Sequence, residues 1–230
     1  MAGHSKWANI RHRKGAQDSK RAKIFTKIIK EITVAARLHG GDQESNSRLR
    51  KAVSNARSNN MPQDNIARAI KKGTGELEGV SYEEMLYEGY GPNGIAILIE
   101  VITDNKNRTV SELRNILNKN DGNLAEPGSV AWMFDRKGEI FISDFSGDEE
   151  KLFDDIINSG ADDFEKIDNG YLITTDQSEL LNAKEALKKK GHNIKSADVI
   201  MVPKSTQDVN EEDQEKIIDL METIDNHDDV

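Results

Sequence analysis

The chain of 230 residues contains no cysteine, only four prolines and few aromatic side chains, which account for 5% of it. Without cysteine there is no disulfide framework, thiolate nucleophile or zinc knuckle. The sequence also lacks a run of about eighteen apolar residues that would cross a membrane, and its beginning lacks the apolar stretch of a secretory signal. We therefore expect a cytoplasmic protein with a mainly aliphatic core and no membrane partner.

Sequence patterns that accompany catalysis or cofactor binding are missing as well. The five histidines do not have metal-ligand spacing, and neither a Walker A sequence nor G-x-S-x-G occurs. Gly89, Gly91 and Gly94 do fit G-x-G-x-x-G. However, Pro92 lies inside that motif, and a β-branched run follows where a helix is required, so a hairpin is favoured. We expect no catalytic residue, no metal site, no cofactor and no small-molecule substrate.

Charge is distributed unevenly along the chain. Residues 1–73 contain 17 lysines and arginines against 5 aspartates and glutamates, a net charge of +12. Residues 74–230 contain 15 against 36, a net charge of −21. A basic segment of this density is typical of proteins that bind the phosphate backbone of nucleic acids. The alternative is a basic helical domain that docks on the acidic domains of its own chain.

The basic segment begins with an arm that has neither helical nor strand periodicity. Gly3 and Gly15 give it conformational freedom. Its cations neutralise phosphate, and its rings offer flat faces on which bases stack. The arm residues that we expect to bind nucleic acid are Lys6, Trp7, Arg11, His12, Arg13 and Lys14. Such an arm suits irregular RNA better than a duplex groove; the alternative is an arm in which Trp7 covers the helices that follow.

The pattern after the arm predicts a helix that begins near Ser19, which would cap it, and ends near Leu38. Ile24, Ile28 and Ile32 recur every four residues and form one apolar stripe. The opposite side is almost purely cationic, whereas a face that served only solubility would mix the two signs of charge. We expect this side to bind nucleic acid through Lys20, Lys23, Lys27, Lys30 and Arg37.

Two shorter helices complete a helical bundle. One is predicted over residues 47–59, and the next has Pro62 at its first position and ends at Gly73. Three short helices of this kind are similar to helix-turn-helix domains, but no helix with base-reading side chains stands out. The stretch from Gly73 to Gly79 reads as a glycine-rich linker.

The acidic remainder predicts two α+β units. In the first, "MLYEGYGPNGIAILIEVITD" predicts two strands around a turn, a helix follows with an inner face that includes Leu113 and Leu117, and "SVAWMF" predicts another strand. The polar residues 105–108 at the start of that helix either contact phosphate or form a capped surface turn.

The second unit, from about Lys137, has the order βαββαβ of a ferredoxin-like domain. The pair Asn169-Gly170 predicts a hairpin inside it. The predicted helices cover residues 149–158 and 178–190. The predicted strands cover residues 139–142, 171–175 and 199–202, and one further strand precedes the Asn169-Gly170 pair. A last helix, from Glu211 to about Asp225, has no place in this unit. We therefore expect it to return to the first α+β unit.

The fold class that follows is a multidomain α+β protein. An N-terminal helical bundle precedes two α+β domains, the second of these ferredoxin-like, and the third domain is inserted in the second. The expected domains are residues 1–78, the discontinuous pair 79–136 and 204–230, and the inserted domain 137–203.

Five stretches of the sequence closely resemble the YebC/PmpR family, which includes the mitochondrial translational activator of cytochrome c oxidase. They are "MAGHSKWANIRHRKGAQDSKRAKIFTKIIKEITVAAR", "NMPQDNIARAIKKGTG", "YEGYGPNGIAILIE", "TDNKNRT" and "GSVAWMFDRKG". The resemblance covers nearly the whole chain and implies the same three domains. The sequence departs from the family where Asp121 replaces a glycine, where "AEPGS" replaces a glycine-containing form, and after "HDDV", where relatives continue with a closing strand.

The resemblance implies a role without catalysis. Bacterial members are described as DNA-binding transcriptional regulators, and others as ribosome-associated factors that assist translation of difficult stretches such as consecutive prolines. We therefore expect a non-enzymatic nucleic-acid-binding regulator of gene expression; the alternative is a ribosome-associated translation factor that binds rRNA. Both stay open, because the phosphate backbone is common to DNA and rRNA.

Overall fold

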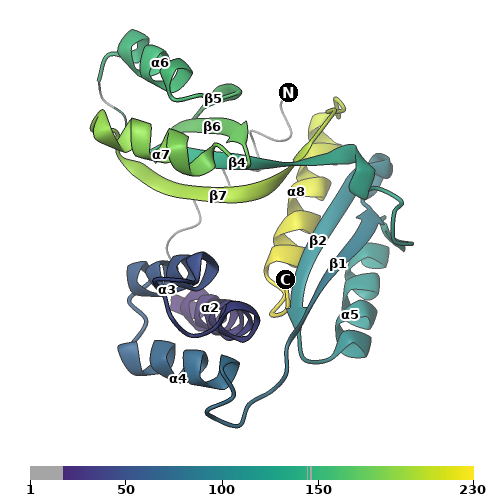
Figure 1. Cartoon of the computed structure of the whole chain (residues 1–230). Coiled ribbons are helices and arrows are strands. Elements are labelled where there is room, and N and C mark those ends of the chain that lie inside the picture. Colours follow the sequence, from purple (N-terminus) through teal and green to yellow (C-terminus); the bar gives the residue numbers. More distant parts are fainter. Residues whose placement is uncertain (1–17, 144, 146) are drawn as a thin grey trace. The chain divides into compact units, whose positions relative to one another are not determined.

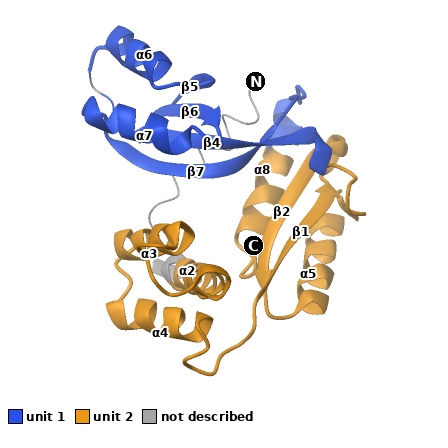
Figure 2. Ribbon diagram, viewed as in Figure 1, with its two compact units in different colours: residues 1–15, 131–214 blue, residues 16–130, 215–230 orange. Residues whose placement is uncertain are grey.

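The computed structural model describes residues 18–143, 145 and 147–230, with side chains from residue 22 onward. The described chain divides into two compact units, one within residues 131–214 and the other within residues 16–130 and 215–230 (Figure 2). Helices and two antiparallel sheets occur together (Figure 1), which confirms the multidomain α+β class. No helix of the described part is long and apolar enough to cross a membrane.

The helical bundle consists of α2 (Asp18–His39), α3 (Ser47–Ser58) and α4 (Gln63–Gly73). Two details of the predicted helix starts are wrong, by two positions for α2 and by one for α4. Ser19 lies inside α2, which begins one residue earlier. Pro62 precedes α4 as its N-cap, because its ψ of 137° is extended rather than helical.

The bundle core is aliphatic and drawn from all three helices. Ile28 and Ile32 of the predicted stripe are buried, whereas Ile24 is 36% exposed. Helix α4 crosses α2 closely because Gly73 has no side chain: a Cβ there would lie 2.4 Å from the carbonyl oxygen of Thr33. The other core residues are Ala35, Ala36, Leu49, Ala52, Val53, Ala56, Met61, Ile66 and Ala69.

A three-stranded antiparallel sheet follows the bundle in the same unit. Strand β1 (Glu83–Tyr90) lies in the middle and pairs with β2 (Ala96–Thr103) on one side and with the short β3 (Asn123–Ala125) on the other. A single 3-10 turn at Pro92–Gly94 connects β1 to β2. The hairpin predicted for the glycine motif is therefore confirmed.

The strand predicted at "SVAWMF" is wrong. Ala131–Met133 form a 3-10 helix (η2), and strand β4 begins only at Phe134. The loop before it is held by Glu88, whose buried carboxylate accepts hydrogen bonds of 2.6 Å from the N–H groups of Gly128 and Val130. Because these backbone donors are bound to a side chain, they do not enter a strand ladder.

Two helices cover one face of this sheet. Helix α5 (Lys106–Lys119) follows β2, and α8 (Glu211–Asp225) has the bounds predicted for the last helix. Alternate residues of β2 pack with both helices, because successive side chains of a strand point to opposite faces. The shared core contains Ile97, Ile99, Val101, Leu113, Leu117, Leu220 and Ile224. The sequence-based domain boundaries stay a prediction.

The other unit has the predicted ferredoxin-like arrangement. Its elements are β4 (Phe134–Ser143), α6 (Glu149–Asn158), β5 (Asp163–Ile167), β6 (Gly170–Asp176), α7 (Leu180–Lys189) and β7 (Ile194–Pro203). The sheet order is β5-β6-β4-β7 with antiparallel pairing throughout, which is the order that βαββαβ connectivity gives.

Candidate nucleic-acid interface

The cationic face of α2 lies against the last turn of the chain, residues 225–229, here called the C-terminal turn. Lys23 Nζ donates a hydrogen bond of 2.9 Å to the carbonyl oxygen of Asn226, and Lys27 Nζ donates to that of Asp225. Each ammonium group also lies near a carboxylate of the turn, at 3.8 and 3.9 Å. Lysines predicted to bind phosphate therefore already contact an acidic segment of their own chain.

Lys30 differs from its neighbours on α2 because it is buried. Its Nζ lies 2.5 Å from Oδ1 of Asp229 and donates a hydrogen bond of 2.7 Å to the carbonyl oxygen of Asp228. Lys30 is 7% exposed and Asp229 is 4% exposed. A buried charge needs an opposite charge beside it. The Lys30 ammonium therefore cannot bind phosphate as long as it is paired with Asp229. Lys30, which the helical pattern places on the cationic side of α2, is therefore not exposed to solvent as that side would suggest.

Asp229 is the centre of a network of donors. Its Oδ2 accepts hydrogen bonds from Thr109 at 2.6 Å, Arg108 at 2.8 Å and Thr103 at 3.1 Å. Burial alone would raise the pKa of the Asp229 carboxyl, but hydrogen bonds from Lys30, Thr109 and Arg108 hold this pKa well below its usual range. The carboxylate is therefore ionised at neutral pH and fastens the C-terminal turn to α2 and α5.

The polar start of α5 forms a capped surface turn, the second of the two interpretations given from the sequence. Asn105 caps the helix by accepting a hydrogen bond of 3.1 Å from the N–H of Arg108. Arg108 also pairs with Asp104 at 2.9 Å, and Lys106 lies 2.5 Å from a carboxylate oxygen of Glu83. These side chains are engaged within the fold.

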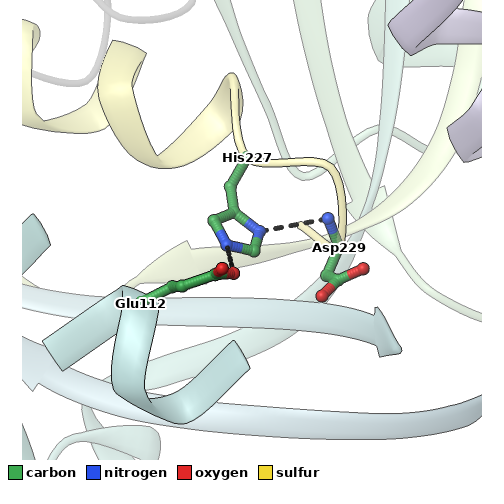
Figure 3. A group of neighbouring side chains, drawn as sticks. All are labelled: Glu112, His227 and Asp229. Atoms are coloured by element: carbon green, nitrogen blue, oxygen red, sulfur yellow. Dashed lines mark hydrogen bonds and ion pairs between the residues drawn. The ribbon is translucent and has the colours of Figure 1, made fainter. Parts of the chain in front are cut away.

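Glu112, His227 and Asp229 gather beside this network (Figure 3). His227 Nε2 lies 2.9 Å from the Glu112 carboxylate, and His227 Nδ1 accepts a hydrogen bond of 3.1 Å from the N–H of Asp229. That geometry places the ring proton on Nε2. Both ring nitrogens are engaged, and the Asp229 carboxylate is held by cations. The three residues are therefore better described as a hydrogen-bonded cluster than as a metal site.

Arg48 is another cation of the bundle that is used internally. Its guanidinium contacts Glu31 of α2 at 2.7 and 2.8 Å and Glu84 of β1 at 2.5 Å. Hydrogen bonds from Arg48 lower the pKa of the Glu84 carboxyl. Arg48 therefore joins the bundle to the sheet.

The cations of α4 are in a different situation. Arg68, Lys71 and Lys72 are all exposed, and so is Arg57 near the end of α3. Within the residues that the structure describes, these four side chains take part in no ion pair. Arg37, near the end of α2, is exposed as well and donates one hydrogen bond of 3.3 Å to the hydroxyl of Ser81.

The structure does not place every predicted binding residue. The arm residues Lys6, Trp7, Arg11, His12, Arg13 and Lys14 lie outside the described residues. Lys20 lies in α2, but its side chain is also outside the described part. Sequence reasoning missed the α4 cations as a group, although their spacing at 68, 71 and 72 puts them on one side of a helix.

In the ferredoxin-like unit, a buried carboxylate is paired with a histidine. Oδ2 of Asp155 on α6 lies 2.9 Å from Nε2 of His192, and its Oδ1 lies 3.4 Å from Nζ of Lys190. The hydrogen bond to His192 lowers the pKa of the Asp155 carboxyl. Because His192 and Lys190 both follow α7, this pair ties the end of α7 to α6.

The fold and its charge distribution define a multidomain α+β protein with a cationic helical bundle. Residues 5–76 match the family described as "TACO1/YebC protein N-terminal domain", and residues 82–230 match the one described as "TACO1/YebC second and third domain". The chain belongs to the TACO1/YebC family.

Relatives match along the whole chain. Proteins named "Probable transcriptional regulatory protein" from Geobacter sulfurreducens and Natranaerobius thermophilus are 52% and 53% identical, and each match covers 100% of this chain and 93% of the relative. A solved structure, a conserved hypothetical protein from Aquifex aeolicus, is 44% identical with a TM-score of 0.89, covering 98% of this chain and 93% of that one.

Proposed function

We propose that this protein is a non-enzymatic regulator of gene expression that binds nucleic acid through its basic N-terminal part, residues 1–73. The observation that carries the proposal is the charge separation, +12 in this part against −21 in the remainder. A polyanion is attracted to the first and repelled by the second. The names of the relatives, "Probable transcriptional regulatory protein", support the regulatory role.

Besides the exposed cations of α4, two sets of side chains contribute to this proposed binding. The arm supplies cations for phosphates and rings for stacking, through Lys6, Trp7, Arg11, His12, Arg13 and Lys14. The helix α2 supplies Lys20, Lys23, Lys27, Lys30 and Arg37. For the three lysines that contact the C-terminal turn, binding requires that the turn first moves away, since phosphate and the turn compete for the same ammonium groups.

A ribosome-associated role is the second candidate, and the composition of the arm favours it. Gly3 and Gly15 allow the arm to follow an irregular backbone, and Trp7 and His12 suit unstacked bases. A duplex reader instead needs a rigid element fitted to a groove. In this version the protein binds rRNA and assists translation.

The three domains at the boundaries predicted from the sequence, and a cytoplasmic location, are parts of the same proposal.

Competition binding tests the proposal and separates its two versions. Full-length protein is titrated with a labelled duplex DNA and with a labelled rRNA fragment at several salt concentrations, each with the other as competitor. If about six phosphates are contacted, the slope of log K against log [salt] should be roughly −4 to −5. Tight binding that is insensitive to salt, or no binding to either nucleic acid, would contradict the proposal.

The variant Trp7→Ala distinguishes a stacking arm from a simple polycation. Each aromatic–base stack contributes about 1–3 kcal/mol, so the rRNA affinity should fall roughly five-fold or more. Trp132→Ala is the matched control, because Trp132 is 67% exposed and lies outside the basic part. Equal competition by duplex DNA, with Trp7→Ala without effect, would favour the transcriptional version.

A further inference from the structure

A hollow of about 280 Å³ lies on the bundle where α2, α4 and the glycine-rich linker meet. Its charged lining residues are both cations, Arg37 from the last turn of α2 and Lys72 from the last turn of α4. The remaining lining is apolar, hydroxylic or glycine, and includes Val34, Ser81 and Tyr82. The hollow therefore combines positive charge with space for a small group.

The hollow is produced by the local geometry of the chain. Gly73 lets α4 approach α2, which brings the ends of the two helices together. The linker then returns over the crossing, and the stem of Lys72 packs against Gly79, where an added Cβ would lie 3.2 Å from the Lys72 side chain. This packing keeps the Lys72 stem beside the linker, on the same hollow that Arg37 lines.

The donors around the hollow are only partly used. The hydrogen bond from Arg37 to Ser81 occupies one of the five N–H donors of a guanidinium. Lys72 has no ion pair within the described part of the chain, and the backbone hydrogen bonds described there do not use the N–H groups of Gly79 and Ser81. Lys30 and Arg48, in contrast, have carboxylates within 2.7 Å.

The geometry points to a phosphate-binding site in this hollow, with the Arg37 guanidinium and the Lys72 ammonium as its two cationic contacts. An arginine binds two phosphate oxygens through its planar fork, and a lysine acts as a point charge beside it. The volume exceeds that of one phosphate, so an attached sugar has room. The phosphate belongs either to a nucleic-acid backbone, in which case the inference rests on the proposed function, or to a free nucleotide.

Two physical effects oppose an anion here. The first is the Glu84 carboxylate, which lies close enough to Arg37 for that cation to help lower its pKa, after the hydrogen bonds from Arg48. The second comes from the helix ends. The carboxyl ends of α2 and α4 both lie at the hollow, and helix dipoles place partial negative charge at those ends. The two cations must therefore offset the dipoles as well as bind the ligand. It follows that neither cation alone suffices, and that removal of either one should weaken binding nearly as much as removal of both.

The test uses full-length protein with Arg37→Gln, Lys72→Gln and the double variant. The matched control is Lys119→Gln with Lys189→Gln, which removes two exposed lysines elsewhere and so changes the net charge equally. A single-stranded RNA of about twenty nucleotides is the first probe. Each hollow variant should lower its affinity roughly ten-fold, and the double variant should make the salt slope shallower by about one to two. The control should change affinity less than three-fold.

Adenosine monophosphate and inorganic phosphate are the second pair of probes, with amide NMR shifts of Gly75 and Gly79 as the readout. Shifts that vanish in the double variant indicate that a free nucleotide is also a source of the phosphate. RNA binding that is lost in the variant, without a response to these small probes, indicates a nucleic-acid backbone. Arg37→Lys combined with Lys72→Arg should restore most of the affinity.

The outcomes for the hollow and for the proposed function are separable. If the double variant binds RNA and the small probes as the control does, the hollow is not a phosphate site, whatever the function. If the wild type binds no nucleic acid, the proposed function fails and the small probes decide: a response lost in the variant supports the hollow, and no response overturns it. Circular dichroism verifies that each variant is folded.

Discussion

The two cationic faces of the helical bundle differ in what lies opposite them. On α2, Lys23, Lys27 and Lys30 contact the acidic C-terminal turn. On α4, Arg68 and Lys71 are exposed and have no ion pair within the described residues. Cations that look alike in the sequence are therefore not equally available to bind phosphate. A phosphate that approaches α2 must displace an existing anion, whereas no carboxylate of the described residues is paired with these cations of α4.

The contacts of α2 are themselves unequal. The Lys23 contact with Asp228 joins two exposed side chains, and such pairs contribute about 0–1 kcal/mol. The pair of Lys30 and Asp229 is buried and surrounded by further hydrogen bonds, so loss of one partner leaves a buried charge without compensation. The C-terminal turn is thus held firmly by the buried pair of Lys30 and Asp229, here called the anchor. It is held only weakly through Asp225 and Asp228, here called the acidic rim.

The largest effect is expected at the anchor. Asp229→Asn keeps the shape of the side chain but removes the negative charge that compensates Lys30, and should lower the free energy of unfolding by about 3–5 kcal/mol. Asp228→Asn is the matched control and should cost less than about 1 kcal/mol. Urea unfolding measures both. Equal effects of the two substitutions would show that the buried pair is no stronger than the rim.

The same anchor predicts a dependence of stability on pH. The pKa of Asp229 is lower in the folded chain than in the unfolded chain. Its contribution is therefore fully present above the ordinary aspartate pKa of about 4, declines as the pH falls below that value, and is lost once the pH passes the lower pKa of the folded chain. Unfolding of the wild type and of Asp229→Asn, measured from pH 7 down to about 2, should show stabilities that converge in acid. A constant difference across this range would contradict the ionic role of the carboxylate.

Local sequence signals account for most of the fold. Helix α6 has the predicted bounds Glu149–Asn158 and α8 has the predicted bounds Glu211–Asp225. Both helices begin with acidic residues, which favour a helix amino-terminus. The order of strands and helices was sufficient to predict the ferredoxin-like sheet. Helix capping and hydrophobic periodicity depend on residues that are close together in the chain, so both can be read from a single sequence.

The sequence-based predictions are wrong where the local structure depends on a residue that is far away in the sequence. Helical periodicity places Lys30 on the polar side of α2, but it contains no information about Asp229, which lies 199 positions further along the chain. The N–H of Ile102 at the edge of β2 also bonds to the carbonyl oxygen of Asp229, at 2.8 Å. The turn at "SVAWMF" likewise depends on Glu88. For the candidate site, a helical wheel therefore predicts which cations share a face but not which of them are already paired.

The third expected effect compares the two faces directly. Arg68→Glu with Lys71→Glu should lower RNA affinity more than ten-fold without loss of stability, because both side chains are exposed. Lys23→Glu with Lys27→Glu should lower affinity less, but should also lower the unfolding temperature, since carboxylates would face the carbonyl groups of the C-terminal turn. A cationic face that served only to bind nucleic acid, as the helical pattern predicts, would instead lose binding with this second pair while the fold stays intact. Equal losses of affinity with unchanged stability would restore that view.

The smallest effect is expected from the acidic rim. Asp225→Asn with Asp228→Asn removes two negative charges beside Lys23 and Lys27 but keeps the carbonyl oxygens that accept their hydrogen bonds. The turn should therefore stay in place while the repulsion of phosphate decreases. We expect RNA affinity to rise about two- to five-fold at low salt, and this gain to disappear near 1 M salt, where the Debye length is only about 3 Å.

Asp154→Asn with Asp162→Asn in the other unit is the matched control for net charge. Because the same gain in the control would reflect total charge alone, only a gain confined to the rim variant indicates that the C-terminal turn competes with nucleic acid for α2. A rim variant with unchanged affinity would mean that Lys23 and Lys27 take no part in binding and serve only to hold the C-terminal turn.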